Sequence, residues 1–87
     1  MSGRRALSLQ RTIVTPSERA RFLDRARQQR DHFSSHACHY WVFEESEVPG
    51  AFIEFTESGD LTVLTAALAG APDPVLDPAR IYREVAL

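Results

Sequence analysis

Tyr40, Glu54 and Tyr82 have side chains suited to acid–base chemistry and lie in apolar stretches of the chain. A carboxyl group that is removed from water has a raised pKa and can accept a proton near neutral pH, while a phenol can orient a substrate oxygen. They share one face of a predicted sheet, and we expect this face to line a ligand pocket or a dimer interface. Its expected members are Gln10, Thr12, Tyr40, Val42, Glu44, Phe52, Glu54, Tyr82 and Glu84.

The catalytic role of Glu54, Tyr40 and Tyr82 is one of two alternatives that the residues leave open. Polar groups on such a face more often hydrogen-bond across a subunit interface than act on a substrate. The sequence alone therefore does not decide whether the protein is an enzyme.

A second group of reactive residues lies within a short stretch and suggests zinc, because imidazole and thiolate are the ligands that zinc prefers. The group is His32, His36, Cys38 and His39. On a strand His36 and Cys38 point to one face and His39 to the other, while His32 is predicted to be helical. The four side chains do not converge without a bend, so we predict no metal site. We expect no cofactor either.

The elements that position these residues begin with a strand over 7–14 and a helix over 16–33. Apolar and polar residues alternate in the strand. Thr15 is the predicted N-cap of the helix, Pro16 its first residue, and Glu18 is expected to reach back to the cap amide. The helix is expected to bury Phe22, Leu23, Ala26 and Phe33.

Two aromatic strands, 37–44 and 51–56, are joined by Pro49-Gly50, which predicts a β-hairpin. We expect Phe43 opposite Phe55, with Trp41 on the same face, between the sheet and the helices. Under that assignment Trp41→Ala would cost about 3–5 kcal/mol of folding free energy.

A second helix is predicted over 59–69, capped by Ser58 or Asp60 and buried through Leu61, Leu64, Ala67 and Leu68. A proline-rich loop at 71–78 and a last strand at 81–87 follow. The order βαββαβ predicts an α+β protein, a ferredoxin-like sandwich with a four-stranded antiparallel sheet. In that sheet the fourth strand lies beside the first, followed by the third and the second. Residues 6–87 form one domain after a flexible start at 1–5.

Charge and composition exclude several function classes. Residues 1–33 carry a net charge of +5 and residues 34–87 one of −7. No stretch is apolar enough to span a membrane, no signal peptide opens the chain, and the one cysteine cannot form an internal disulfide. We therefore expect a cytoplasmic protein. Arginine without lysine suggests a GC-rich bacterial genome.

RNA binding is also not expected, although residues 51–55 match the second half of the aromatic octamer of RNA-recognition motifs. The basic residue, glycine and first aromatic of that octamer are replaced here by Val48, Pro49 and Gly50. Acidic side chains would also surround the phosphate path, which opposes binding. They are Glu44, Glu45, Glu47, Glu54 and Glu57.

The whole-chain order, the Val14-Thr15-Pro16-Ser17-Glu18 helix entry and the strands 40–43, 52–55 and 81–85 resemble the dimeric α+β-barrel superfamily, in particular the small antibiotic-biosynthesis-monooxygenase-like proteins. The resemblance implies a homodimer in which two sheets pack into an α+β barrel, with a ligand cavity between sheet and helices or loops. We expect the dimer face to bear Tyr40, Phe52 and Glu54.

The resemblance also implies a small-molecule-binding protein, of the kind that oxidises an aromatic or polyketide-like substrate without a cofactor. A non-catalytic dimeric binding or interaction protein is the alternative. The resemblance assigns no catalytic residue. The asparagine of the haem-degrading branch is absent, since residues 7–14 contain none.

Overall fold

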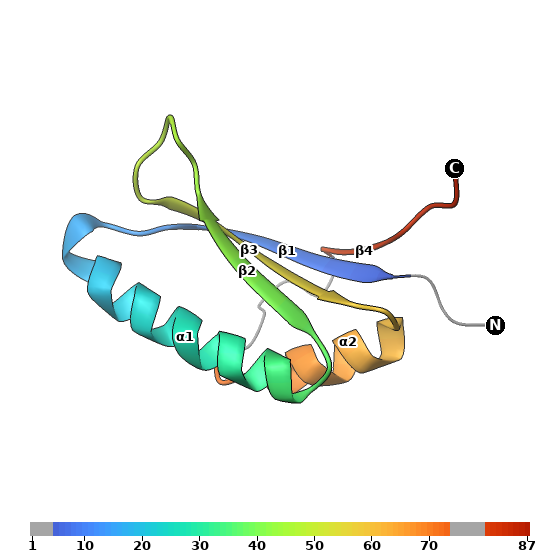
Figure 1. The fold of residues 1–87 in the computed structure, drawn as a ribbon. Coiled ribbons are helices and arrows are strands. Elements are labelled where there is room, and N and C mark those ends of the chain that lie inside the picture. The colour runs from blue at the N-terminus through green and yellow to red at the C-terminus, as the bar shows by residue number, and fades with distance from the viewer. Residues whose placement is uncertain (1–4, 74–79) are drawn as a thin grey trace.

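The computed structural model describes residues 5–73 and 80–87, so most of the predicted flexible start and residues 74–78 of the predicted loop lie outside the described residues. The described part has an α+β, ferredoxin-like fold, in which both helices cover the same face of an antiparallel sheet (Figure 1). The predicted order of elements is confirmed. The elements are β1 (Ala6–Ile13), a 3-10 turn (Pro16–Glu18), α1 (Arg19–Ser35), β2 (His39–Glu44), β3 (Ala51–Ser58), α2 (Leu61–Ala69) and β4 (Ile81–Arg83).

The strands lie in the order β2-β3-β1-β4, as predicted. The register of the hairpin is two residues away from the predicted one, because Trp41 is opposite Phe55 and Phe43 is opposite Ile53. The ladder ends where the Glu45 amide donates to the Ala51 carbonyl at 2.9 Å. The loop therefore spans 46–50, and its length sets the observed register. An even shift keeps the same residues together on each face.

The start of α1 differs from the predicted capping box. The Thr15 side chain makes no capping hydrogen bond, and its hydroxyl lies 3.3 Å from that of Ser17. Residues 16–18 form a 3-10 turn, so the α-helix starts at Arg19 and Glu18 pairs with Arg21 at 3.2 Å instead of with the cap.

At α2 one of the two predicted caps is confirmed. Asp60 accepts hydrogen bonds from the amides of Thr62 and Val63 at 2.7 and 3.2 Å. The helix buries Leu64, Ala67 and Leu68 as predicted, whereas Leu61 is exposed. β4 is shorter than predicted and pairs only with residues 6–8 of β1.

The two faces of the sheet are reversed relative to the prediction. Phe52 is 3% exposed and its ring lies 4.6 Å from Phe22 of α1, while Tyr40 stacks on Phe33 at 5.5 Å. Trp41 is 44% exposed on the other side. The helices therefore cover the face that carries Tyr40 and Phe52, and the dimer face predicted from the sequence is wrong.

Small hydroxyl residues on the covered face allow the helices to pack against it. Ser8, Thr56 and Ser58 are all buried there. Their alternation with apolar residues made the face look solvated, yet their small size lets the helices pack closely against the strands. Among the described residues no buried side-chain polar atom lacks a hydrogen-bond partner, and the Ser58 hydroxyl, for example, accepts from the Asp60 amide at 3.3 Å.

The opposite side of the sheet, which we call the open face, has no helix over it (Figure 1). The register places mainly apolar residues on it, in place of the polar ones expected. They are Leu7, Leu9, Ile13, Trp41, Phe43, Ile53, Phe55 and Tyr82. None of the described helices has the length and apolarity needed to cross a bilayer.

Candidate functional site

Tyr40 and Glu54 meet between the sheet and α1. The Tyr40 hydroxyl donates to Glu54 Oε1 at 2.5 Å. The pair is brought together because Tyr40 and Glu54 are diagonal neighbours on the covered face of β2 and β3, where Val42 is the residue opposite Glu54. The stacking of Tyr40 on Phe33 fixes the phenol against the helix.

Burial changes the acid–base properties of both groups. Removal from water raises the pKa of the Glu54 carboxyl above its usual value, and the hydrogen bond from Tyr40 opposes this only in part. Burial and the neighbouring carboxylate also raise the pKa of the Tyr40 phenol strongly. Glu54 is therefore the group of this pair that can exchange a proton, and Tyr40 is the donor that orients it.

Asp73, in the segment after α2, lies near the Tyr40–Glu54 pair and is held there by Gln29. The Gln29 side chain, which is buried, donates to the Asp73 carbonyl at 3.0 Å and accepts from the Asp73 amide at 3.1 Å. The Asp73 carboxylate contributes to the raised pKa of Glu54, and Arg25 opposes it. These contacts hold an acidic group near Glu54, which adds to the upward shift of its pKa.

Glu54→Gln is expected to make stability less dependent on pH. Because the folded state raises the pKa of Glu54, its favourable contribution is complete below the unfolded pKa and is lost as pH rises through the folded pKa. Glutamine does not titrate and still accepts from Tyr40. The variant should thus gain stability relative to wild type as pH rises from about 4 through the folded pKa of Glu54, as measured by urea unfolding at several pH values.

Glu47→Gln is the control for this measurement, because it removes the same charge from the exposed hairpin tip. A difference between Glu54→Gln and wild type that stays constant with pH would show that Glu54 is not desolvated.

The other predicted site residues divide between the two faces. Tyr82 lies opposite Leu7 on the open face, half-exposed, and so cannot act together with Tyr40 and Glu54. Glu84 follows it on that side, where it meets Arg5. The expected single face is therefore wrong, since the remaining members lie on the helix-covered side: Gln10, Thr12, Tyr40, Val42, Glu44, Phe52 and Glu54.

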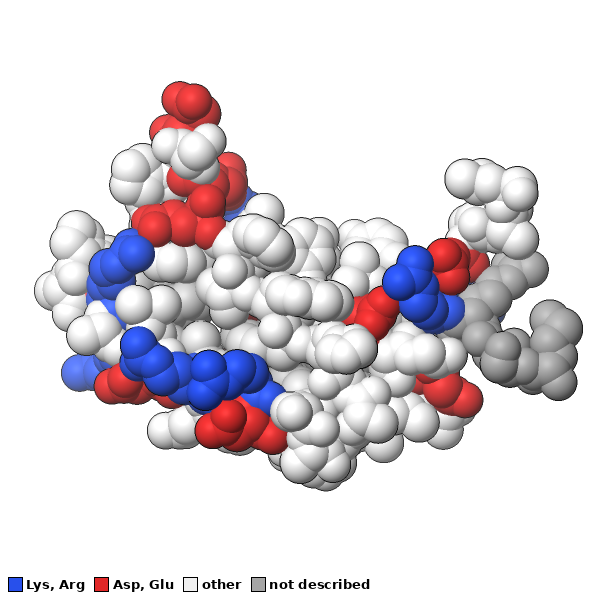
Figure 2. Space-filling model, viewed as in Figure 1, with Lys and Arg blue, Asp and Glu red and all other residues white. Residues whose placement is uncertain are grey.

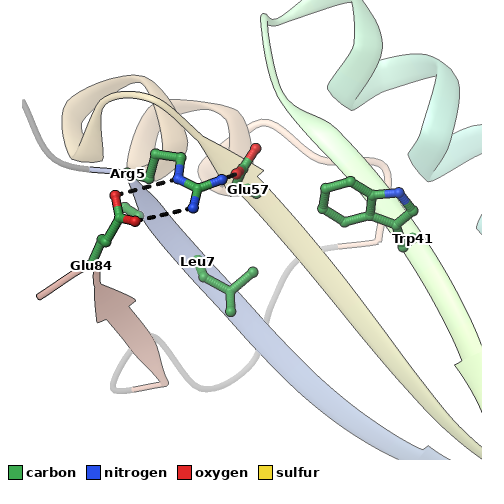
Figure 3. Close-up of a pocket in the computed structure, with 6 residues that line it drawn as sticks. Arg5, Leu7, Trp41, Glu57 and Glu84 are labelled. Carbon is green, nitrogen blue, oxygen red and sulfur yellow. Dashed lines mark hydrogen bonds and ion pairs between the residues drawn. The ribbon is translucent and has the colours of Figure 1, made fainter. Parts of the chain in front are cut away.

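No sequence pattern predicts the groove on the open face, which Figure 3 shows. Its volume is about 310 Å³, and Leu7 and Trp41 form an apolar floor and wall, with Arg5, Glu57 and Glu84 at its polar end. Sequence analysis missed it because it joins the start of β1 to the ends of β3 and β4. Only the strand register shows that these segments meet.

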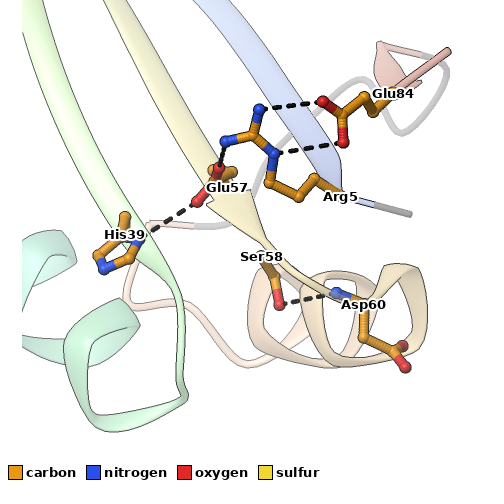
Figure 4. A network of polar contacts seen from close by, with 6 residues as sticks. All are labelled: Arg5, His39, Glu57, Ser58, Asp60 and Glu84. Carbon is orange, nitrogen blue, oxygen red and sulfur yellow. Dashed lines mark hydrogen bonds and ion pairs between the residues drawn. The ribbon is translucent and has the colours of Figure 1, made fainter. Parts of the chain in front are cut away.

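Four charged or titratable groups form a network at this end of the open face (Figure 4). Arg5 donates to both oxygens of Glu84 at 3.3 and 3.1 Å and to Glu57 at 3.0 Å. His39 Nδ1 lies 3.2 Å from the other oxygen of Glu57. Glu57 keeps only 17% of its side chain exposed and joins Arg5 to His39, so this network forms a polar rim for the groove.

A second groove, which we call the α1–β2 groove, runs between α1 and the outer edge of β2. Its volume is about 170 Å³, and it is lined by Leu23, Ala26, Arg27, Arg30, Tyr40 and Val42. Tyr40 belongs both to this groove and to the pair with Glu54, so the groove is the approach to that pair from outside.

Of the four predicted metal-ligand candidates, His32 and His36 lie with their ring centroids 4.2 Å apart, whereas Cys38 and His39 have different surroundings. His32 Nε2 lies 2.9 Å from the Ala67 carbonyl oxygen, and His39 is on the open face with Glu57. Cys38 is buried in the core, where desolvation raises the pKa of its thiol and lowers its reactivity. Within residues 5–73 and 80–87 no group of three or more such side chains could hold a metal ion.

Comparisons with known proteins identify a similar fold but no family. No family model matches the chain, and no curated protein matches its sequence. A conserved protein from Methanosarcina mazei Go1, known from a crystal structure, superposes with a TM-score of 0.70 at 17% sequence identity. The match covers 77% of this chain and 68% of that chain. At this identity the likeness shows the fold alone.

Proposed function

We propose that this protein is a homodimer that binds a small, largely apolar molecule at the open face of its sheet. The observation that supports this is the exposure of large apolar side chains there, with Phe43 57% and Trp41 44% exposed. A monomeric protein seldom leaves a contiguous apolar patch of this kind on its surface, and such patches typically mark interaction sites.

The size of the chain also supports a second copy as the partner. A stable interface buries about 800 Å² on each partner, roughly an eighth of the 6055 Å² that this chain exposes. Packing two open faces together would supply that area and give the α+β barrel that the sequence resemblance implies. Such a two-fold contact is self-complementary, because each copy presents the same face.

The ligand is proposed to occupy the groove between Arg5 and Trp41. Its volume of about 310 Å³ lies at the lower limit of ligand pockets, which typically hold about 300–1,000 Å³. Leu7 and the Trp41 indole would contact an apolar or aromatic body. Arg5, Glu57 and Glu84 would meet a polar end.

Phe43→Glu is expected to turn the dimer into a monomer of 9.8 kDa, because it places an unpaired charge on the packed open face. Sedimentation velocity at micromolar concentration measures this. Val48→Glu is the control: Val48 is exposed by 44% but lies in the hairpin loop. A wild-type protein that sediments as a monomer would contradict the proposed dimer.

A second candidate function is a reaction at the Tyr40–Glu54 pair, which lies between the sheet and α1. Tyr40 and Glu54 support a cofactor-independent, monooxygenase-like reaction on an aromatic or polyketide-like substrate, since their close hydrogen bond sits in a desolvated site. Glu54 would take the proton from an acidic ring CH₂. Dioxygen would then oxidise that carbon to a carbonyl, giving one oxygen atom to the product and the other to water.

Oxidation of anthrone by the protein tests this second candidate. Glu54→Gln is expected to lower kcat/KM about a hundredfold, because general-base catalysis contributes about 10²–10⁴-fold. Tyr82→Phe should leave the rate unchanged, since Tyr82 lies on the opposite face. If anthrone is consumed at the uncatalysed rate, the non-catalytic dimeric binding protein is the function that remains.

A further inference from the structure

The outer edge of β2 has unpaired backbone groups. β2 is the first strand in the order of the sheet, so only β3 pairs with it. The amide of Glu45 donates to the carbonyl of Ala51, and hydrogen-bonded residues alternate along an antiparallel ladder. The amides and carbonyls of Tyr40, Val42 and Glu44 therefore point away from β3, toward the outer edge. Among the described residues none donates to or accepts from these groups.

Between its end residues, His39 and Glu44, this edge also lacks the features that normally prevent strand addition. Natural edge strands are interrupted by charges, proline or bulges. Residues 40–43 are Tyr-Trp-Val-Phe, without a charge or a proline, and six residues pair with β3 in continuous register. Such an edge is competent to pair with one more strand.

The α1–β2 groove lies directly beside this edge and would receive the side chains of an added strand. Leu23 and Ala26 come from α1 and Val42 from β2, so the floor is apolar. Every second side chain of an extended segment would point into it. The volume of about 170 Å³ has room for such small aliphatic side chains.

Positive charge borders the groove on the helix side. α1 contains five arginines and two aspartates, and Figure 2 shows arginines along the helix beside an uncharged surface. Arg27 and Arg30 line the groove, and their only ion pairs within the described part are with exposed acids of the same helix, Asp24 at 2.7 Å and Asp31 at 3.3 Å. Exposed pairs of this kind are weak and can be exchanged for another carboxylate.

We propose that the edge of β2 and the α1–β2 groove bind an extended peptide segment of another protein, with aliphatic residues at alternate positions and acidic residues beside them. Backbone hydrogen bonds to Tyr40 and Val42 give the affinity, and the groove and the arginines select the side chains. A second copy of this chain fits less well. Pairing two β2 edges would bring two α1 helices together, each with a net charge of +3.

This inference does not rest on the proposed function, because the peptide site uses the edge of the sheet and the proposed dimer uses its open face. If the oxygenation candidate holds, the same peptide also inhibits it, since a bound strand covers Tyr40.

The probe is the peptide acetyl-Glu-Val-Thr-Val-Thr-Val-Glu-amide, titrated into the full chain by calorimetry and amide hydrogen exchange. Binding is expected to slow exchange at Tyr40 and Val42, whose amides point outward, with little change at Trp41, whose amide already pairs with β3. A peptide with lysine in place of glutamate should bind at least tenfold more weakly. In the bound peptide only alternate amides face the protein, because a strand pairs through one edge. N-methylation of one set, either the valine amides or the threonine amides, should therefore abolish binding, whereas methylation of the other set should be tolerated.

Arg27→Glu combined with Arg30→Glu should weaken binding at least tenfold. Arg21→Glu is the matched control, because Arg21 is on the same helix, 74% exposed, and does not line the groove. Absence of binding at about 1 mM peptide, or tolerance of both methylated peptides, would overturn the proposal. Protection of Tyr40 and Val42 that rises with protein concentration without peptide would assign the edge to a second copy and overturn it as well.

Discussion

Phe33→Ala is expected to destabilise the protein by about 3–5 kcal/mol, a large part of the 5–15 kcal/mol typical of a domain. Phe33 is 1% exposed and packs with Leu64 and Leu68 of α2 in the main core cluster, with Tyr40 against it. Its removal leaves a cavity where both helices meet the sheet. Urea unfolding followed by circular dichroism gives the free energy.

Trp41→Ala is the comparison that makes this result informative. The structure places Trp41 44% exposed on the open face, so its truncation should cost about 1 kcal/mol when measured on dilute, monomeric protein. The larger loss of folding free energy, which the sequence predicts for Trp41→Ala, is expected for Phe33→Ala instead. If Phe33→Ala is unfolded, Phe33→Leu, with an expected loss of about 1–2 kcal/mol, keeps the comparison measurable. Equal losses at Phe33 and Trp41 would contradict the assignment of the two faces.

Gly50→Ala is expected to cost about 2–3 kcal/mol, the second large effect. Gly50 has a φ of +90°, and a Cβ there would lie 2.6 Å from the Val14 carbonyl oxygen, which is backbone and cannot move aside. The same contact joins the hairpin to the end of β1, since the Val14 amide donates to the Gly50 carbonyl at 2.7 Å. An alanine must therefore strain the turn or break this link.

Gly59→Ala is the matched control, because a Cβ at Gly59 meets no atom within 4 Å. Its effect should stay within about 0.5 kcal/mol. Both variants are measured by the urea midpoint at constant m-value. A loss below about 1 kcal/mol at Gly50 would mean that the hairpin and β1 are not held together as the structure shows.

Local sequence signals were sufficient to predict the helices and strands and their order along the chain. Pro49-Gly50 predicted the hairpin, and Asp60, one of the two predicted caps, was confirmed at the start of α2. The failure at Thr15 was also local: a 3-10 turn and an α-helix share the same entry residues, and the choice between them depends on small differences in hydrogen-bond geometry.

The alternation within each strand determined by itself which residues share a face, because side chains alternate strictly along a strand whatever the register. It did not determine which face the helices cover. Both faces of this sheet carry aromatic residues, and the covered one also carries Ser8, Thr56 and Glu54. Only packing decided this: Phe22 and Phe33 of α1 meet Phe52 and Tyr40, and small hydroxyl residues admit the helices.

The candidate sites divide in the same way. Only the register of the structure makes Tyr40 and Glu54 diagonal neighbours; the sequence predicted no more than that they share one face. It placed them on the wrong side of the sheet and could not foresee the groove between Arg5 and Trp41 or the uncovered edge of β2. These sites join segments distant in the chain, and their proximity follows from the strand order and helix packing, which are non-local and leave no pattern in any one segment.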